Sequence, residues 1–218
     1  MEAGILFYED FFGTAFPWVK YENIFCPEFR IRGMENVGMI NMTDKYFRPK
    51  IELTELSRFE YLKVCVHELS HMWFGNLVTM KWWNDLWLKE SFADYCAGVC
   101  LTALATKFKK VVKNPEQAFL HFLTEAINED VLETTHPIQV TVNDTNDAAN
   151  VFDKICYRKG ACFVRQIGVF VGEDVLKEGM KMYFEKYALQ NTELADFMAC
   201  FQEAAKKKQL DVDLDIWM

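Results

Sequence analysis

The chain has 218 residues, of which 51% are hydrophobic and 15% aromatic, so it can bury a sizeable core in one large domain or two small ones. Its formal net charge of −8, with no long basic patch, argues against a nucleic-acid-binding surface. No apolar run approaches the roughly 20 residues that a membrane-spanning helix requires, so no membrane span is expected.

The first 53 residues are expected to form a short helix and a small sheet. Residues 5–12 are apolar and aromatic with acidic residues on another face, which predicts a helix that ends near Gly13. Residues 21–29 are rich in aromatic and branched side chains but contain Pro27, so they predict an edge strand or a strand followed by a bend. Residues 33–40 predict a second short extended piece.

A helical pattern begins at residue 54. Thr54 can cap this helix, and apolar residues recur at three- or four-residue spacing up to the segment that contains His67 and His71. We expect Gly75 and Asn76 to end it.

A second helix is predicted to carry Glu90. Its cap is expected to be Asn84 or Asp85. The two helices are expected to pack side by side, which would bring Glu90 to His67 and His71.

The rest of the chain, from about residue 115, is mostly helical in period. No internal repeat and no firm domain boundary is found beyond the change from sheet to helices near residue 54. The predicted elements are one long loop marked by Pro137 and residues 143–150, a helix over 151–171, and a last helix over about 192–208.

The spacing of two histidines and two glutamates predicts a catalytic zinc site. His67 and His71 lie four residues apart, so they share a helix face and can bind one ion, whereas Glu68 is rotated by about 100° and stays off the metal. Glu90 is the expected third ligand, which leaves a fourth position for water. Burying these carboxylates with two histidines would be costly without a cation, so a chance pattern is disfavoured. One zinc ion per chain is predicted.

Such a site supports metal-assisted hydrolysis. Zinc would lower the pKa of a water toward about 7, and Glu68 would take its proton as hydroxide attacks a carbonyl. The resulting oxyanion needs a second electrophile besides the metal. The other two histidines, His121 and His136, have no such neighbours and are predicted to be surface or packing residues.

Cysteine usage favours a reducing compartment. The seven cysteines are odd in number and scattered, and several lie inside apolar helical pattern. Cys96 and Cys100 are four residues apart and could in principle bind a metal, but core packing is favoured because no further ligand is close in sequence. The first residues lack the pattern of a secretory signal, so a cytoplasmic protein is expected.

Three stretches together are similar to the aminopeptidase N and puromycin-sensitive aminopeptidase family of zinc metallopeptidases, a group of gluzincins. Their order and spacing match over nearly the whole chain, and the combination is more specific than the zinc motif alone. The stretches are Gly33-Met34-Glu35-Asn36, then His67-Glu68-Leu69-Ser70-His71 with its continuation to Glu90, and Tyr157-Arg158-Lys159-Gly160-Ala161.

This resemblance implies an α+β fold, the thermolysin-like catalytic domain of a metallopeptidase, over residues 1–218. A small amino-terminal sheet would occupy about residues 1–53, and a mainly helical lobe would occupy about 54–218. The family also has an amino-terminal β domain and a carboxy-terminal helical domain, both of which we expect to be absent from this chain.

The resemblance also implies the role of each site residue. His67, His71 and Glu90 would bind zinc, Glu68 would be the general base, and Tyr157 would stabilise the tetrahedral intermediate. Without the resemblance, Tyr157 would be interpreted as a packed aromatic residue.

A further set of residues would select the substrate. Glu35 would bind the free α-amine, and the backbone around Gly33 and Met34 would align the first peptide bond. A fixed carboxylate at a set distance from the metal favours a charged amino terminus. Without the family pattern, Glu35 would be interpreted as a solvated carboxylate at a strand edge. The implied function is zinc-dependent removal of amino-terminal residues from peptides, in peptide catabolism.

The chain departs from the family pattern at three positions. Arg32 stands where glycine is usual, so the substrate-aligning strand is expected to sit differently or to narrow the pocket. Lys89 and Ser91 replace the common asparagine and glycine beside Glu90, which is expected to alter the hydrogen bonding around the third ligand.

Two alternatives stay open. An epoxide hydrolase of the leukotriene type shares the zinc motif and the Gly-Met-Glu-Asn stretch, although Trp73-Phe74-Gly75 and Met80-Lys81-Trp82-Trp83 are more similar to the aminopeptidases. The other alternative is an inactive fragment that zinc stabilises and that serves as a binding module.

Overall fold

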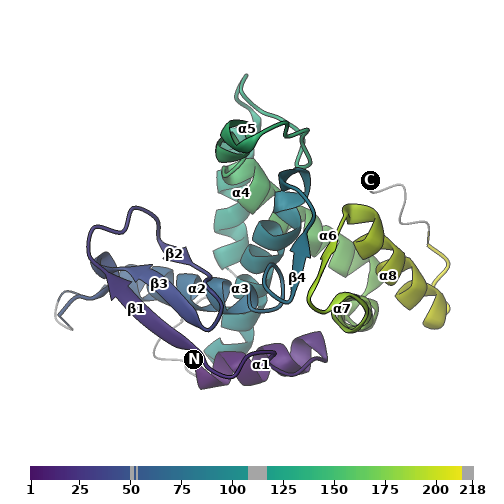
Figure 1. The fold of residues 1–218 in the computed structure, drawn as a ribbon, viewed down its shortest axis with the longest axis horizontal. Coiled ribbons are helices and arrows are strands. Elements are labelled where there is room, and N and C mark those ends of the chain that lie inside the picture. The colour runs from purple at the N-terminus through teal and green to yellow at the C-terminus, as the bar shows by residue number, and fades with distance from the viewer. Residues whose placement is uncertain (50–51, 53, 108–116, 213–218) are drawn as a thin grey trace.

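A computed structural model describes residues 1–49, 52, 54–107 and 117–212 (Figure 1). The chain begins with one helix and three strands: α1 (Glu2–Phe12), β1 (Glu22–Cys26), β2 (Gly33–Met34) and β3 (Met39–Thr43). The mainly helical part that follows contains α2 (Glu55–Ser70), β4 (Val78–Met80), α3 (Leu86–Lys107), α4 (Gln117–Asp130), α5 (Thr145–Asn150), α6 (Gly160–Val171), α7 (Glu173–Tyr187), β5 (Gln190–Thr192) and α8 (Leu194–Lys207). This order confirms the predicted α+β class, in which a small amino-terminal sheet precedes a helical lobe.

The amino-terminal sheet has the strand order β1-β3-β2, with β1 parallel and β2 antiparallel to β3. Residues 21–29 were predicted to form an edge strand or a strand followed by a bend, and both descriptions hold, because β1 lies at an edge and the chain turns at Pro27. The prediction of one extended piece over residues 33–40 is wrong. The chain turns at Gly38, whose φ is 71°, so this segment contributes to two different strands.

Helix α2 begins where it was predicted but ends earlier. The Thr54 side chain accepts a hydrogen bond from the Ser57 N–H at 3.1 Å, which is the expected N-cap. The helix ends at Ser70 rather than at Gly75 and Asn76, because the chain tightens into turns in which the Trp73 N–H donates to the Ser70 carbonyl.

The predicted cap of α3 is also corrected. Asn84 and Asp85 lie in a 3-10 turn, Trp83–Asp85, that precedes the helix. The Asn84 side chain accepts from the Val142 N–H at 2.8 Å, and Asp85 accepts from the Leu194 N–H at 3.1 Å. Both side chains therefore bind distant segments to the start of α3.

Two predictions for the second half of the chain need correction. Residues 143–150 are not all loop, because Asp144 accepts from two backbone N–H groups and caps the short helix α5. The segment 151–171 is not one helix from its first residue. A π-helical turn, Ile155–Lys159, precedes α6. The predicted last helix is confirmed as α8.

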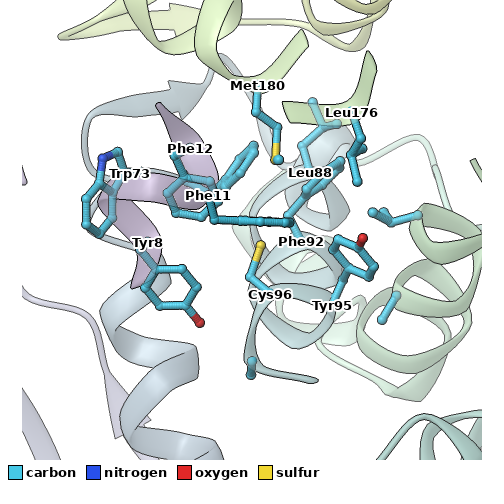
Figure 2. Packing of buried hydrophobic residues seen from close by; sticks show 14 of the residues in the cluster. Tyr8, Phe11, Phe12, Trp73, Leu88, Phe92, Tyr95, Cys96, Leu176 and Met180 are labelled. Atoms are coloured by element: carbon cyan, nitrogen blue, oxygen red, sulfur yellow. The ribbon is translucent and has the colours of Figure 1, made fainter. Parts of the chain in front are cut away.

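The hydrophobic core draws side chains from most of the helices, and α1, α3 and α7 meet within it. Figure 2 shows Tyr8 and Phe12 of α1 beside Trp73, with Phe92 of α3 and Met180 of α7 on the other side of the cluster. The Tyr8 hydroxyl donates to the Val66 carbonyl at 2.9 Å, which ties α1 to α2. This packing holds α2 and α3 together, and α2 also contacts strand β2 of the amino-terminal sheet.

Five of the seven cysteines are buried in the hydrophobic core. All seven are free, and Cys96 and Cys100 are buried within the core, as predicted. Among the described residues, no helix has the length and apolar character needed to cross a membrane.

Candidate active site

The three predicted metal ligands lie together. His67 is in the last turn of α2, His71 directly follows that helix, and Glu90 is on α3. The Nε2 atoms of the two histidines are 3.2 Å apart. The Glu90 Oε2 atom is 3.5 Å from His67 Nε2 and 3.4 Å from His71 Nε2.

These separations fit a zinc ion. Ligand atoms bound tetrahedrally at 2.0–2.2 Å from zinc lie about 3.3–3.6 Å from one another. A second group that could hold a metal, formed by Glu35, Glu68 and His71, lies in the same place. The group of His67, His71 and Glu90 fits zinc better, because it supplies two imidazole nitrogens and one carboxylate.

The Nδ1 atom of each histidine, which faces away from the other histidine, has a hydrogen-bond partner that orients the ring. His67 Nδ1 is 3.0 Å from Asp94 Oδ1, and His71 Nδ1 is 2.9 Å from the Phe74 carbonyl oxygen. With the proton on Nδ1, each Nε2 would be free to bind a metal ion. Sequence reasoning missed Asp94, although its position four residues after Glu90 on one helix was a usable signal.

The charges of this cluster are coupled. Burial alone would lower the pKa of His67, but its hydrogen bonds with Asp94 and Glu90 raise that pKa to about 10. Burial would raise the pKa of Glu90, but His71 and His67 hold it well below its usual range. A divalent cation would replace the protons of the imidazoles as the charge that balances the carboxylates.

Glu68 lies beside these residues and faces strand β2; the prediction that it stays off the metal remains a prediction. A Cβ atom on Gly33 would be 2.2 Å from Glu68 Oε1, so only glycine allows the strand to pass so close to this carboxyl group. Burial raises the pKa of Glu68 to about 7, while His67 and His71 oppose the shift. A carboxylate with this pKa is well matched to general base catalysis near neutral pH.

Tyr157 also lies at the cluster. It is in the π-helical turn Ile155–Lys159, and its ring lies 6.1 Å from that of His67, centroid to centroid. Burial raises the pKa of the Tyr157 hydroxyl, and the Glu90 carboxylate raises it further. The hydroxyl therefore stays protonated and can donate a hydrogen bond. The π-helical turn was not predicted from the sequence.

Glu35 lies directly after β2 and is buried, with 8% of its surface exposed. Its carbonyl accepts from Asn76 Nδ2 at 2.7 Å, and its Oε1 atom accepts from Lys89 Nζ at 2.5 Å. It is therefore not the solvated strand-edge carboxylate of the alternative interpretation. The contact with Lys89 was not predicted.

One cavity of about 560 Å³ joins these groups. Its lining includes the three predicted metal ligands, Glu68, Tyr157 and the predicted substrate-binding residues Gly33, Met34 and Glu35. Trp83 and Phe152 form an aromatic part of the wall, with ring centroids 5.9 Å apart. The structure thus brings every predicted site residue to a single hollow.

The positions that depart from the family pattern have identifiable partners. Arg32 borders the cavity and pairs with Glu60, with 2.8 Å between Nη1 and Oε2. The Ser91 hydroxyl donates to the Cys156 carbonyl at 2.6 Å, so it binds α3 to the turn that carries Tyr157.

The two remaining histidines lie outside this cavity. His121 is exposed and 3.4 Å from Glu125, whereas His136 is partly buried and 2.6 Å from Asp153 Oδ2. This placement agrees with their prediction as surface or packing residues.

Comparisons with known proteins point to one family. A family profile described as "Peptidase family M1 domain" matches residues 1–217. The chain is 37% identical to a protein named aminopeptidase N from Streptomyces lividans, over 98% of this chain and 24% of that protein. It is 35% identical to a leucyl aminopeptidase from Saccharolobus solfataricus, over 91% of this chain and 25% of that protein. It is 34% identical to an alanine/arginine aminopeptidase from Saccharomyces cerevisiae, over 97% of this chain and 24% of that protein.

Proposed function

The chain belongs to peptidase family M1, and we propose that it is the catalytic core of a zinc-dependent aminopeptidase. Its substrates would be peptides with a free amino terminus, from which it removes the first residue. The observation that carries this proposal is the single cavity in which His67, His71 and Glu90 meet Glu68 and Glu35. The chain spans about a quarter of the length of the relatives named above, so the activity of the whole protein is part of the proposal.

His67, His71 and Glu90 would hold the zinc ion. When bound, zinc supplies a Lewis acid that polarises the substrate carbonyl and lowers the pKa of water. Glu68 accepts the proton of the attacking water and later delivers a proton to the leaving amine. Its buried position beside Gly33, in the cavity that the proposed ligands line, supports this role.

Tyr157 and the strand after Arg32 would position the substrate. The protonated Tyr157 hydroxyl donates a hydrogen bond to the oxyanion that forms as water attacks. The carboxylate of Glu35 binds the α-ammonium group, and the backbone of Gly33 and Met34 aligns the first peptide bond. A substrate that binds Glu35 through its α-ammonium group and Tyr157 through its carbonyl oxygen would have its first carbonyl group next to the proposed metal ligands.

Turnover of aminoacyl-coumarin substrates by the purified chain tests the activity. We expect hydrolysis that a chelator abolishes and that added zinc restores. Glu68→Gln should lower kcat by roughly 10²–10⁴-fold with zinc content unchanged, because it removes the base but no ligand. Glu203→Gln is the matched control, since Glu203 is an exposed residue on α8 that pairs with Lys207, and it should keep full activity.

The same assay separates the alternatives. A chain that is folded and binds zinc but cleaves no substrate would contradict the proposal and favour a binding module. Acetylation of the substrate's amino terminus should stop cleavage, and equal cleavage of acetylated peptides would exclude the proposed role of Glu35. The names of the relatives favour an aminopeptidase over an epoxide hydrolase. The cytoplasmic location stays a prediction.

A further inference from the structure

An ammonium group of the chain itself already binds the carboxylate of Glu35. Lys89 Nζ is 2.5 Å from Glu35 Oε1 and 3.1 Å from Glu90 Oε1. The side chain of Lys89 is only 12% exposed and lines the same cavity as the metal ligands. The proposed function assigns Glu35 to the substrate's α-ammonium group, which has the same charge and the same kind of donors as Lys89.

The structure holds both partners of this ion pair in place. The carbonyl of Glu35 is bonded to Asn76, in the turn after α2. The aliphatic part of Lys89 packs against Gly75 in the same turn, since a Cβ atom on Gly75 would lie 3.3 Å from Lys89 Cδ. Exposed ion pairs are weak because two mobile side chains must be ordered and water screens them. This pair is buried and anchored on both sides, so it is a substantial competitor for a ligand.

We propose that Lys89 is a specificity-determining residue that competes with the substrate's α-ammonium group for the carboxylate of Glu35. This inference rests on the proposed function, because it concerns the same subsite. Lys89 offers only donors, so it occupies the acceptor positions that an incoming ammonium group needs. Recognition of a free amino terminus is therefore weaker than it would be with a neutral side chain at position 89.

Binding of L-leucinamide tests the competition directly. The ligand is titrated into zinc-loaded and metal-free chains that carry Glu68→Gln, so that no hydrolysis intervenes, and its Kd is measured by NMR. Lys89→Gln keeps a hydrogen-bond donor for Glu35 but removes the charge. We expect it to tighten leucinamide binding roughly tenfold, the lower end of what a charge-assisted hydrogen bond contributes. Binding of N-acetyl-leucinamide, which lacks the ammonium group, should not change.

Lys89→Arg is the matched control, because it keeps the positive charge and should produce no gain in affinity. Circular dichroism and zinc content show that each variant is folded and loaded. A Kd for leucinamide that Lys89→Gln leaves equal or raises would overturn the proposal. The absence of measurable leucinamide binding to Lys89→Gln would overturn it as well.

A double-mutant cycle with Glu35→Gln shows whether Lys89 acts through Glu35. In the Glu35→Gln background, Lys89→Gln should no longer tighten leucinamide binding. An equal gain there would overturn the proposal. The proposed function fails separately, through absence of turnover by the unsubstituted zinc-loaded chain, whereas the Lys89 inference is decided by binding alone.

Discussion

The orientation of the imidazole of His67 depends on a single carboxylate. Asp94 accepts from His67 Nδ1 with one oxygen and contacts Arg158 with the other. Arg158 also binds Glu125, with 2.8 Å between Nε and Oε2. This chain of contacts fixes the ring of His67, a proposed metal ligand, without supplying a ligand atom itself, so its effect should appear in zinc affinity.

Asp94→Asn should weaken zinc binding by roughly 10- to 100-fold, the usual effect of losing a partner of a ligating histidine. Competition with a chromogenic chelator measures the affinity. Glu125→Gln is the control, because Glu125 contacts Arg158 but not His67. Equal zinc affinities of the two variants would show that Asp94 does not orient the ligand.

At the scale of elements, the crossing of α3 and α6 depends on a glycine that faces a serine. A Cβ atom on Gly160 would be 1.8 Å from Ser91 Oγ and 2.8 Å from Ser91 Cβ. Because the Ser91 hydroxyl is bonded to the Cys156 carbonyl, it cannot move away without losing that bond. The close approach keeps the π-helical turn, and Tyr157 with it, next to Glu90.

Gly160→Ala should destabilise the chain by about 1–2 kcal/mol. Overpacking costs up to about 3 kcal/mol, and the better helix propensity of alanine offsets roughly 1 kcal/mol of it. Urea unfolding measures the free energy. Adding Ser91→Gly removes both close contacts, so the double variant should be more stable than Gly160→Ala alone. No recovery in the double variant would show that the two residues do not clash.

His136 is hydrogen-bonded to Asp153, the residue that binds the start of the π-helical turn Ile155–Lys159. Asp153 accepts from the Cys156 N–H with its side chain and from the Tyr157 N–H with its carbonyl, and His136 Nε2 is 2.6 Å from its Oδ2 atom. Burial acts to lower the pKa of His136, but hydrogen bonds with the Pro137 carbonyl and with Asp153 outweigh it and raise that pKa. Protonated His136 therefore stabilises the folded chain.

The sign of the pH effect follows from this shift. The contribution of His136 should be fully present below the unfolded pKa of about 6.5 and should be lost as the pH rises through the higher folded value. We expect His136→Gln to remove this part of the pH dependence of the unfolding free energy, measured in urea between acidic and mildly alkaline pH. An unchanged pH profile in the variant would contradict the assignment.

At the scale of the whole molecule, the proposed metal ligands connect two helices that the core packs together. His67 and His71 belong to the end of α2, and Glu90 belongs to α3. An ion that binds the folded chain but not the unfolded chain stabilises it in proportion to the logarithm of its concentration. Zinc is therefore expected to be a structural stabiliser as well as a catalytic group.

Free zinc at about 1,000 times its Kd should raise the free energy of unfolding by roughly 4 kcal/mol. Thermal unfolding with zinc or with chelator measures this difference. Glu90→Ala should lose most of the zinc-dependent stabilisation, whereas Glu203→Gln should keep it. A zinc-dependent rise of equal size in Glu90→Ala would mean that zinc binds elsewhere.

Local pattern was sufficient to predict several features of this protein. The cap at Thr54, the end of α1 at Gly13 and the sharing of one face by His67 and His71 each depend on residues within a few positions of one another. Helix geometry is set by such short spacings, so the sequence alone determined them. The order of the family motifs supplied the proposed roles of Glu35 and Tyr157, which stay predictions.

Only the tertiary structure decided the features that join distant segments. The parallel pairing of β4 with β5, the binding of Leu194 by Asp85, and the ion pair of Lys89 with Glu35 each connect residues more than 50 positions apart. No local spacing encodes such contacts, because they form when the core brings helices and strands together. The sequence gives the identities of Glu35 and Lys89, but only the packing of the chain decides that the ammonium group of Lys89 lies against the carboxylate of Glu35.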